Sequence, residues 1–261
     1  MLRVEGLSVS YGGKELVLKN VTITFDRKTL LLGPNGAGKT TFFRAICGIT
    51  PKVSGKIYLD GVDLDMVSGK TGYVVANLPE IHNLLYVDAY TLLEVYMDLL
   101  EGDTYRALEI LELFGLRESF LKKAKLHTMS AGQRKIFLNA IVLSTKARVK
   151  LLDEPFEQLD PAKKSLLIEL LEKDYSLIIL STHETWLIEK LSGWDAAFMF
   201  EGQIHGKISV DKLLGLYVVY EADPNAVLTI RTQRVVISLV EEPKGRKLED
   251  FMSLDYIYKL M

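Results

Sequence analysis

Residues 33–40 read Gly-Pro-Asn-Gly-Ala-Gly-Lys-Thr, and the fold expected for the rest of the chain follows from this stretch. It fits the pattern G-x-x-x-x-G-K-[ST] in full, in which glycines let successive backbone N–H groups turn toward phosphate oxygens. A short apolar run, residues 28–32, precedes it, and residues 40–49 follow with a helical pattern. A strand, a glycine-rich turn and a helix in this order predict a phosphate-binding loop.

Each residue type in this loop has a chemical reason. The helix that begins near Gly38 points its positive end at the same anion. Lys39 is expected to bridge the β- and γ-phosphates of a nucleotide, and the Thr40 hydroxyl to ligate Mg²⁺. The motif by itself indicates a P-loop NTPase of any class, with a glycine-rich turn that binds nothing as the alternative. The candidate phosphate-binding residues are Gly33, Pro34, Asn35, Gly36, Ala37, Gly38, Lys39, Thr40 and Thr41.

The composition is that of an ordinary globular protein. The 261 residues carry 32 Lys and Arg against 34 Asp and Glu, so the chain is not built to wrap nucleic acid by charge, and no nucleic-acid partner is expected. The single cysteine, Cys47, allows no internal disulfide and is expected to pack in the core. No stretch approaches the ~18–20 uninterrupted apolar residues of a membrane helix, so a cytoplasmic protein is expected.

The order of apolar patterns predicts an α/β fold. The first thirty residues alternate as half-buried antiparallel strands, and residues 149–191 read as strand, helix, strand and helix. The second pattern implies a parallel sheet covered by helices. We expect three parts: a core at 1–80 and 129–214, a helical insert at 81–128, and a β-rich C-terminal extension of unknown role at 215–261.

Two further groups of residues narrow the class of NTPase. Residues 149–154 read Val-Lys-Leu-Leu-Asp-Glu, a buried strand that ends in two carboxylates. Beside a phosphate-binding loop, Asp153 is expected to hold Mg²⁺ and Glu154 to accept a proton from an attacking water. Taken alone, the pair reads equally well as two solvated acidic residues. Residues 129–133 (Met-Ser-Ala-Gly-Gln) precede the helix that leads to this strand, and His183 follows the next apolar strand.

In this order and spacing the motifs resemble those of the ATP-binding cassette (ABC) ATPases, over about residues 1–210. The resemblance implies a P-loop fold of the ABC ATPase type, with a mixed sheet core, an antiparallel β subdomain and a helical insert. It implies ATP and Mg²⁺ as cofactors. Tyr11 stands where the family has an aromatic residue that stacks on adenine.

The resemblance also assigns roles to the later motifs. Ser130, Gly132 and Gln133 correspond to the signature that contacts the γ-phosphate of ATP held by a second subunit. Glu154 corresponds to the general base, and His183 to the residue that holds the γ-phosphate and the attacking water. GTPases lack the signature and this histidine.

Because one chain supplies the phosphate-binding loop and another the signature, the resemblance implies two nucleotide-binding subunits, identical or different, that face head to tail. Asp160 is then expected at their interface. The leading hypothesis is an ATPase that drives substrate transport through separate membrane-spanning permease subunits, peripheral on the inner face of the cell membrane. The insert is expected to carry the docking surface: most of its apolar and aromatic residues close its own core, and a few line a groove for a permease helix.

Two other hypotheses belong to different classes. One is an ABC ATPase without a transporter, such as the iron–sulfur assembly type, which is also a single short cassette. The other is a regulatory ATP sensor that barely hydrolyses, and the presence of Glu154 and His183 disfavours it.

The sequence departs from the family pattern at two places. Met129 and Ala131 replace the Leu and Gly that the family most often shows, and both changes are modest. The family also places a Gln at the end of the strand before the insert, where it touches Mg²⁺, and residues 72–83 contain no Gln. Asn77 or Glu80 must stand in, and we favour Glu80 as the metal-contacting residue because Leu-Pro-Glu resembles a variant found in exporter-type ATPases.

Overall fold

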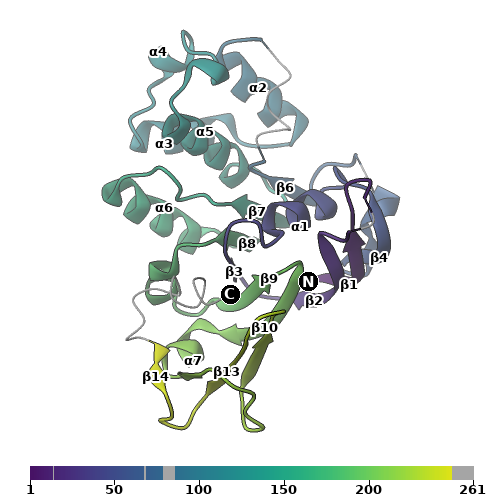
Figure 1. Cartoon of the computed structure of the whole chain (residues 1–261). Helices are drawn as coiled ribbons and strands as arrows, with labels where there is room; N and C mark the ends of the chain where they lie inside the picture. The colour runs from purple at the N-terminus through teal and green to yellow at the C-terminus, as the bar shows by residue number, and fades with distance from the viewer. Residues whose placement is uncertain (14, 68, 79–85, 249–261) are drawn as a thin grey trace. The chain divides into compact units, whose positions relative to one another are not determined.

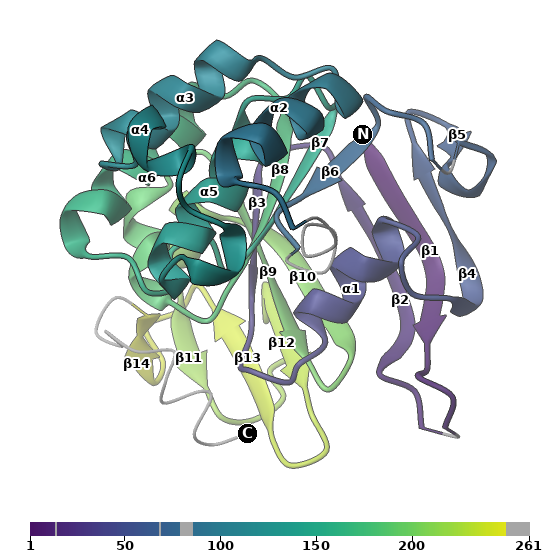
Figure 2. The same cartoon turned by 90° about the horizontal axis from the view of Figure 1, so that it is seen from above.

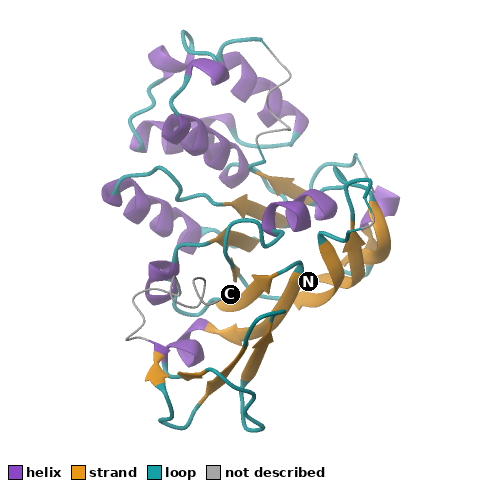
Figure 3. Cartoon of the chain, viewed as in Figure 1, coloured by secondary structure: helices purple, strands orange, loops and turns teal. Residues whose placement is uncertain are grey.

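The computed structural model describes residues 1–13, 15–67, 69–78 and 86–248 (Figure 1). The chain divides into two compact units, the first formed by Met1–Met66 with Ile179–Met261 and the second by Val67–Ile178. Both units contain strands and helices, which confirms the mixed α/β fold predicted from the sequence (Figure 3). No helix among the described residues is long and apolar enough to cross a bilayer.

An antiparallel sheet begins the first unit. Its strands are, in order across the sheet, β2 (Leu18–Phe25), β1 (Leu2–Val9), β4 (Lys52–Leu59) and β5 (Val62–Asp63). Val4 pairs with Ile23 on one side and with Ile57 on the other, so the alternating apolar residues predicted for β1 share one buried face. The short helix η1 (Leu64–Val67) follows β5.

A mixed sheet lies beside it in the same unit. The fully buried strand β3 (Thr29–Leu32) runs parallel to β9 (Asp195–Phe200) and to residues 179–182 of β8 (Leu177–Thr182). Strand β10 (Gln203–Ser209) returns antiparallel to β9. Parallel strands share one carboxyl edge, so the segments that follow β3 and β8 emerge at the same edge of the sheet.

Helix α1 (Lys39–Ile46) leaves this edge (Figure 2), and its Phe42 ring packs against Phe25 of β2 at a centroid distance of 6.1 Å. Cys47, at the end of α1, is half-buried, and burial raises the pKa of its thiol to about 12. The predicted helix after β8 is a short 3₁₀ helix, η4 (Thr185–Lys190), and α7 (Val210–Leu214) follows β10.

A small antiparallel sheet completes the first unit. Its order is β12 (Leu228–Arg231), β13 (Val236–Val240), β11 (Tyr217–Val219) and β14 (Arg246–Lys247). The side chains of Ile230 and Ile237 are fully buried, and Leu228 lies against Gly206 of β10. An ion pair of 2.7 Å between Lys212 of α7 and Glu241 adds a polar contact to this packing.

The second unit is mainly helical. Strands β6 (Val74–Ala76) and β7 (Val149–Asp153) pair in parallel. The helices are α2 (Ala89–Leu99), α3 (Thr104–Leu113), α4 (Glu118–Leu121), η3 (Leu126–Thr128), α5 (Ala131–Leu143) and α6 (Pro161–Lys173). Asp88 caps α2 and Asp103 caps α3, each through a backbone N–H three residues on.

The apolar residues expected to form a docking surface have different environments. Leu92 and Leu93 on α2 are fully buried and close the core of the helical unit. Tyr86 is 83% exposed, and Leu84 and Leu85 lie outside the described residues. Only part of the apolar pattern is therefore available to a partner.

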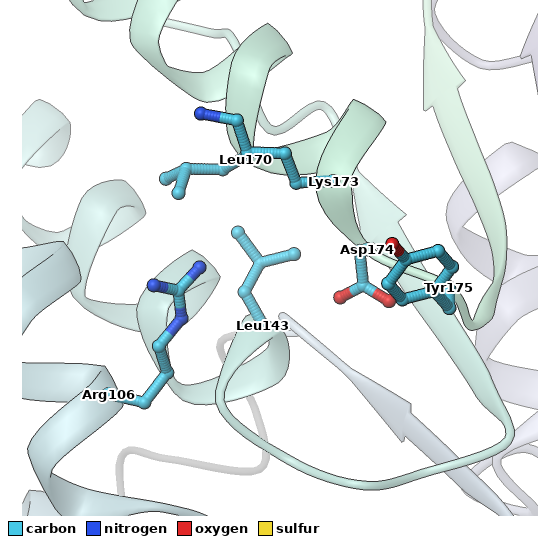
Figure 4. A pocket seen from close by; sticks show the side chains of 6 residues that line it. All are labelled: Arg106, Leu143, Leu170, Lys173, Asp174 and Tyr175. Carbon is cyan, nitrogen blue, oxygen red and sulfur yellow. The ribbon is translucent and has the colours of Figure 1, made fainter.

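A buried ion pair joins β7 to the segment after α6. Lys150 donates to Asp174 Oδ2 at 2.6 Å and to the Leu143 carbonyl at 3.2 Å. Burial by itself would raise the pKa of Asp174, but the hydrogen bonds from Lys150 and Ser176 lower this pKa below its ordinary value. Asp174 also lines a pocket of about 220 Å³ with Arg106, Leu143, Leu170, Lys173 and Tyr175 (Figure 4).

Loss of Asp174 should be costly because Lys150 would stay buried without its partner. We expect Asp174→Ala to lower the free energy of unfolding by about 3 kcal/mol, measured by urea denaturation at pH 7. Because the pKa of Asp174 is lowered in the folded chain, this contribution is present above about pH 4 and disappears as the pH falls through the folded pKa. Glu169→Ala, which removes an exposed ion pair on α6, should cost under about 1 kcal/mol. Equal losses in the two variants would contradict the assignment.

Candidate functional site

The loop 33–40 is fixed at three points by backbone groups. Its first residue, Gly33, donates its N–H to the carbonyl of Thr182 at 3.2 Å. Ala37 donates to the Pro34 carbonyl at 3.2 Å and accepts from Gly202, in the turn between β9 and β10, at 3.0 Å. The bonds to Thr182 and Gly202 hold the loop against the carboxyl edge of the mixed sheet, and the bond from Ala37 to Pro34 closes its own turn.

Two glycines of this loop are required by their surroundings. A Cβ atom on Gly33 would lie 2.3 Å from the carbonyl oxygen of Met199, so no larger residue fits there. Gly38 has φ +108, and its Cβ would lie 3.0 Å from the Met199 Cε atom. Gly33 and Gly38 therefore serve close packing on β9 as well as the turn itself.

The N-terminal end of α1 is suited to an anion. Among the described residues, no side chain caps this end of the helix, and its first turn contains no acidic residue. The Lys39 side chain is only 6% exposed, and its amine donates to the carbonyls of Gly33 (2.7 Å) and Pro34 (3.1 Å). A helix N-terminus without a cap next to a cationic side chain favours phosphate.

Tyr11 is held to the same helix by its hydroxyl. The Tyr11 oxygen lies 3.1 Å from Thr41 Oγ1 and accepts a hydrogen bond of 3.5 Å from Arg44. Partial burial would raise the pKa of Tyr11, but the hydrogen bonds to Thr41 and Arg44 lower it overall. Its ring remains 56% exposed, so an aromatic face fixed to α1 is available for a flat ligand.

His183 lies at the carboxyl end of β8, one residue beyond the carbonyl that anchors Gly33. The turn that carries it is held locally, because Glu184 donates its N–H to Thr182 Oγ1 at 2.9 Å. Trp186 Nε1 in turn donates to Glu184 Oε2 at 2.6 Å. The first unit thus brings His183, Tyr11 and the loop 33–40 to one edge of its mixed sheet.

The second unit holds the signature residues at the start of α5. Ser130 and Gln133 form a capping box, with bonds of 3.2 Å from Gln133 N–H to Ser130 Oγ and 2.9 Å from Ser130 N–H to Gln133 Oε1. A Cβ atom on Gly132 would lie 2.8 Å from the carbonyl of Gln158. The signature therefore packs directly on the turn that follows the acidic pair.

The acidic pair ends β7. Asp153 is the last residue of the strand, and Glu154 adopts φ +45, a left-handed conformation that is uncommon for a residue with a side chain.

Asp160, expected at a subunit interface, caps α6 through Lys163 N–H at 3.0 Å and pairs with the Lys163 amine at 2.7 Å. The hydrogen bond from Lys163 lowers the pKa of Asp160.

A set of side-chain hydrogen bonds around Asp153 was not expected from the sequence. Asn77 Oδ1 accepts from Asp153 N–H at 2.7 Å, and Asn77 Nδ2 donates to Asn139 Oδ1 at 2.8 Å. Lys135 donates to the Asp153 carbonyl at 3.1 Å. The available signal was a lone asparagine, Asn139, in the apolar run of α5. Glu80, favoured as a metal-contacting residue, lies outside the described residues.

The oxygen donors suit Mg²⁺ bound with a nucleotide. Within the part of the chain that the structure describes, no three His, Cys, Asp or Glu side chains gather into a metal cluster. Mg²⁺ usually takes one or two protein oxygens and completes its shell with phosphates and water. The Thr40 hydroxyl in the first unit and the Asp153 carboxylate in the second are each an oxygen donor of this kind.

Comparison with known proteins places the chain among transport ATPases. The family model described as "ABC transporter" matches residues 18–157, more than half of the chain. The lantibiotic transport ATP-binding protein SrtF of Streptococcus pyogenes is 29% identical over 85% of this chain and 99% of its own length. The phosphonates import ATP-binding protein PhnC of Wolinella succinogenes is 30% identical over 72% of this chain and 76% of its own.

A solved structure resembles the entire chain. It is a provisionally named cobalt transport ATP-binding protein (cbiO-2), with a TM-score of 0.89 and 29% identity. The match covers 100% of both chains, so the small C-terminal sheet is part of the shared fold.

Gly33→Ala should destabilise the first unit because the added methyl group meets the Met199 carbonyl. We expect a loss of about 2–3 kcal/mol in the free energy of unfolding, measured by chemical denaturation. Gly36→Ala is the matched control, since its Cβ meets no atom within 4 Å and only its φ of +84 is unfavourable. That control should lose about 1 kcal/mol, and an equal loss in both would exclude the packing explanation.

Proposed function

Because this chain belongs to the ABC transporter family of ATPases, we propose that it hydrolyses ATP as a head-to-tail dimer and so drives transport through separate permease subunits. The observation that carries the proposal is the preformed loop 33–40, which leads into the uncapped end of α1 beside the buried amine of Lys39. This arrangement is suited to a polyphosphate, and the names of the relatives are those of transport ATP-binding proteins.

In this proposal the first unit holds the nucleotide. Backbone N–H groups of the loop and the Lys39 amine contact the phosphates, and the exposed ring of Tyr11 stacks on adenine. The proposed phosphate contacts are Gly33, Pro34, Asn35, Gly36, Ala37, Gly38, Lys39, Thr40 and Thr41. On binding, the Lys39 amine exchanges the carbonyls of Gly33 and Pro34 for phosphate oxygens.

Thr40 and Asp153 are the proposed Mg²⁺ ligands, with Glu80 as a third candidate. The ion supplies charge neutralisation for the β- and γ-phosphates when it is bound. Asp153 can serve this role because its backbone N–H and carbonyl are both engaged by side chains, which fixes the backbone from which its carboxylate projects.

Glu154 is the proposed general base. It accepts a proton from a water molecule whose oxygen attacks the γ-phosphorus, and the bond to the β–γ bridging oxygen breaks. ADP leaves with the bond's electron pair, and inorganic phosphate carries the new oxygen. His183 holds the γ-phosphate and the water in line, which its fixed turn at the end of β8 supports.

The signature residues Ser130, Gly132 and Gln133 are proposed to contact the nucleotide of a second subunit. Their capping box fixes the start of α5, so its first backbone N–H groups keep one direction. Asp160 is proposed at the subunit interface.

We assign a permease as the membrane-bound partner, which would hold this chain at the inner face of the membrane. The transport names of the relatives favour this assignment over a role in iron–sulfur assembly.

Glu154→Gln should abolish turnover while it preserves nucleotide binding, because the amide keeps the shape of the side chain but accepts no proton. We expect the ATP hydrolysis rate to fall by at least about 100-fold, measured by phosphate release with Mg²⁺. With ATP and Mg²⁺ the variant should elute as a dimer in size-exclusion chromatography. Glu169→Gln, an exposed carboxylate on α6, is the control and should hydrolyse ATP like the wild type. Normal turnover by Glu154→Gln would remove this residue from the base role.

Tyr11→Ala should weaken ATP binding without slowing the chemical step. We expect the KM for ATP to rise about 5-fold or more, with kcat unchanged, because one base-stacking surface is lost. Tyr11→Phe keeps the ring but loses the bond to Thr41, so its KM should lie between those of wild type and Tyr11→Ala. Tyr175→Ala removes a fully exposed tyrosine from the second unit as a control. Equal KM values for Tyr11→Ala and wild type would exclude stacking by Tyr11.

A further inference from the structure

The backbone at Glu154 is held from both sides by two asparagines. Asn77 binds the residue before it, accepting from the Asp153 N–H at 2.7 Å and donating to the Asp153 carbonyl at 3.3 Å. Asn139 binds the residue after it, donating to the Pro155 carbonyl at 3.0 Å. The two asparagines also bond each other at 2.8 Å, so they form one connected unit around the acidic pair.

The hydrogen bonds of the two asparagines surround a residue, Glu154, whose backbone conformation is strained. Glu154 has φ +45, which costs an L-residue with a side chain about 1 kcal/mol or more. Such a conformation persists only where the surrounding structure over-determines it. The asparagines supply that constraint, and both are almost completely buried, with exposures of 1% for Asn77 and 3% for Asn139.

Helix α5 also carries Lys135, whose amine donates a second hydrogen bond to the Asp153 carbonyl that Asn77 binds. Lys135 and Asn139 are four residues apart and so lie on one face of the helix. Lys135 donates to the Asp153 carbonyl at 3.1 Å, and the same helix begins at the signature residue Ser130. The acidic pair is therefore tied to the helix that presents the signature.

We propose that Asn77 and Asn139, supported by Lys135, are positioning residues that hold the carboxylate of Glu154 in its reactive direction. This inference rests on the proposed role of Glu154 as general base. The proposal also makes Asn77 a positioning residue rather than a metal ligand. Its Oδ1 is engaged by the Asp153 N–H, and its Nδ2 by Asn139 and the Asp153 carbonyl.

The test separates positioning from simple packing by means of a double variant. Asn77→Leu alone leaves the Oδ1 atom of Asn139 buried without its donor, whereas Asn77→Leu with Asn139→Leu removes both polar groups and keeps their shape. We expect the melting temperature to fall in the single variant and to recover only in part in the double variant, because the Asp153 N–H and the Pro155 carbonyl still lack their side-chain partners. The kcat for ATP should fall about 10- to 100-fold in both and should not recover, because the peptide groups around Glu154 stay unsupported.

Two binding measurements accompany the rates. The KM for ATP and the affinity for a fluorescent ATP analogue in EDTA should stay within about 2-fold of wild type in all variants, because the loop 33–40 is unaltered. Thr145→Val is the matched control, since it removes a buried hydrogen bond of α5 that closes on the Val142 carbonyl. It should lower the melting temperature and leave kcat unchanged.

Lys135→Met provides a second route if the asparagine variants do not fold, because Lys135 is only partly buried. It should lower kcat several-fold at constant KM, while Lys146→Met, an exposed lysine, should not. Recovery of kcat together with stability in the double variant, or an unchanged kcat in every variant, would overturn the proposal. The proposed function itself would be overturned by a different result: the wild type shows no ATP hydrolysis, or it shows hydrolysis that Glu154→Gln does not abolish.

Discussion

The close approach of two backbone segments to the loop 33–40 is the constraint on which the first unit depends. Gly33 is seated against the Met199 carbonyl and bonded to Thr182, while Ala37 is bonded to Gly202. Backbone groups of the strands and of the turn between β9 and β10 therefore fix the shape of the loop. The start of α1, the hydroxyl anchor of Tyr11 and the turn that carries His183 all take their places from the strands that hold this loop. Preorganisation of this kind lowers the cost of binding an anion.

The second unit fixes its chemical groups in a different way. The segment 153–155 is held by side chains bonded to its peptide groups. Asn77 follows β6, and Lys135 and Asn139 both come from α5. Side-chain bonds of this type are sensitive to single substitutions, whereas a backbone contact is lost only when the strand itself moves. The family relationship makes the phosphate-binding loop expected, whereas the side-chain bonds around residues 153–155 became visible only in the structure.

Local patterns predicted the parts of the structure that local forces determine. The first helix predicted within residues 149–191 is α6 (Pro161–Lys173), where Asp160 caps the helix and Pro161 occupies its first position. The buried strand that ends at Asp153 and the short strand before the glycine loop were also predicted, because their patterns likewise lie in residues adjacent in the chain. The bonds of Asn77 reach residues 62 and 76 positions away in sequence, so no periodicity could reveal them. Lys150 likewise sits in an apolar strand with a partner, Asp174, that only the fold supplies.

The central claim is that the loop 33–40 and Lys39 form the binding site for the phosphates of ATP. Calorimetric titration of ATP with Mg²⁺ into the wild type and into Lys39→Met tests it most directly. We expect one site in the wild type and a loss of at least about 10-fold in affinity in the variant, because one charge-assisted contact to the phosphates is removed. Equal affinity in the two proteins, or no heat of binding in the wild type, would contradict the account.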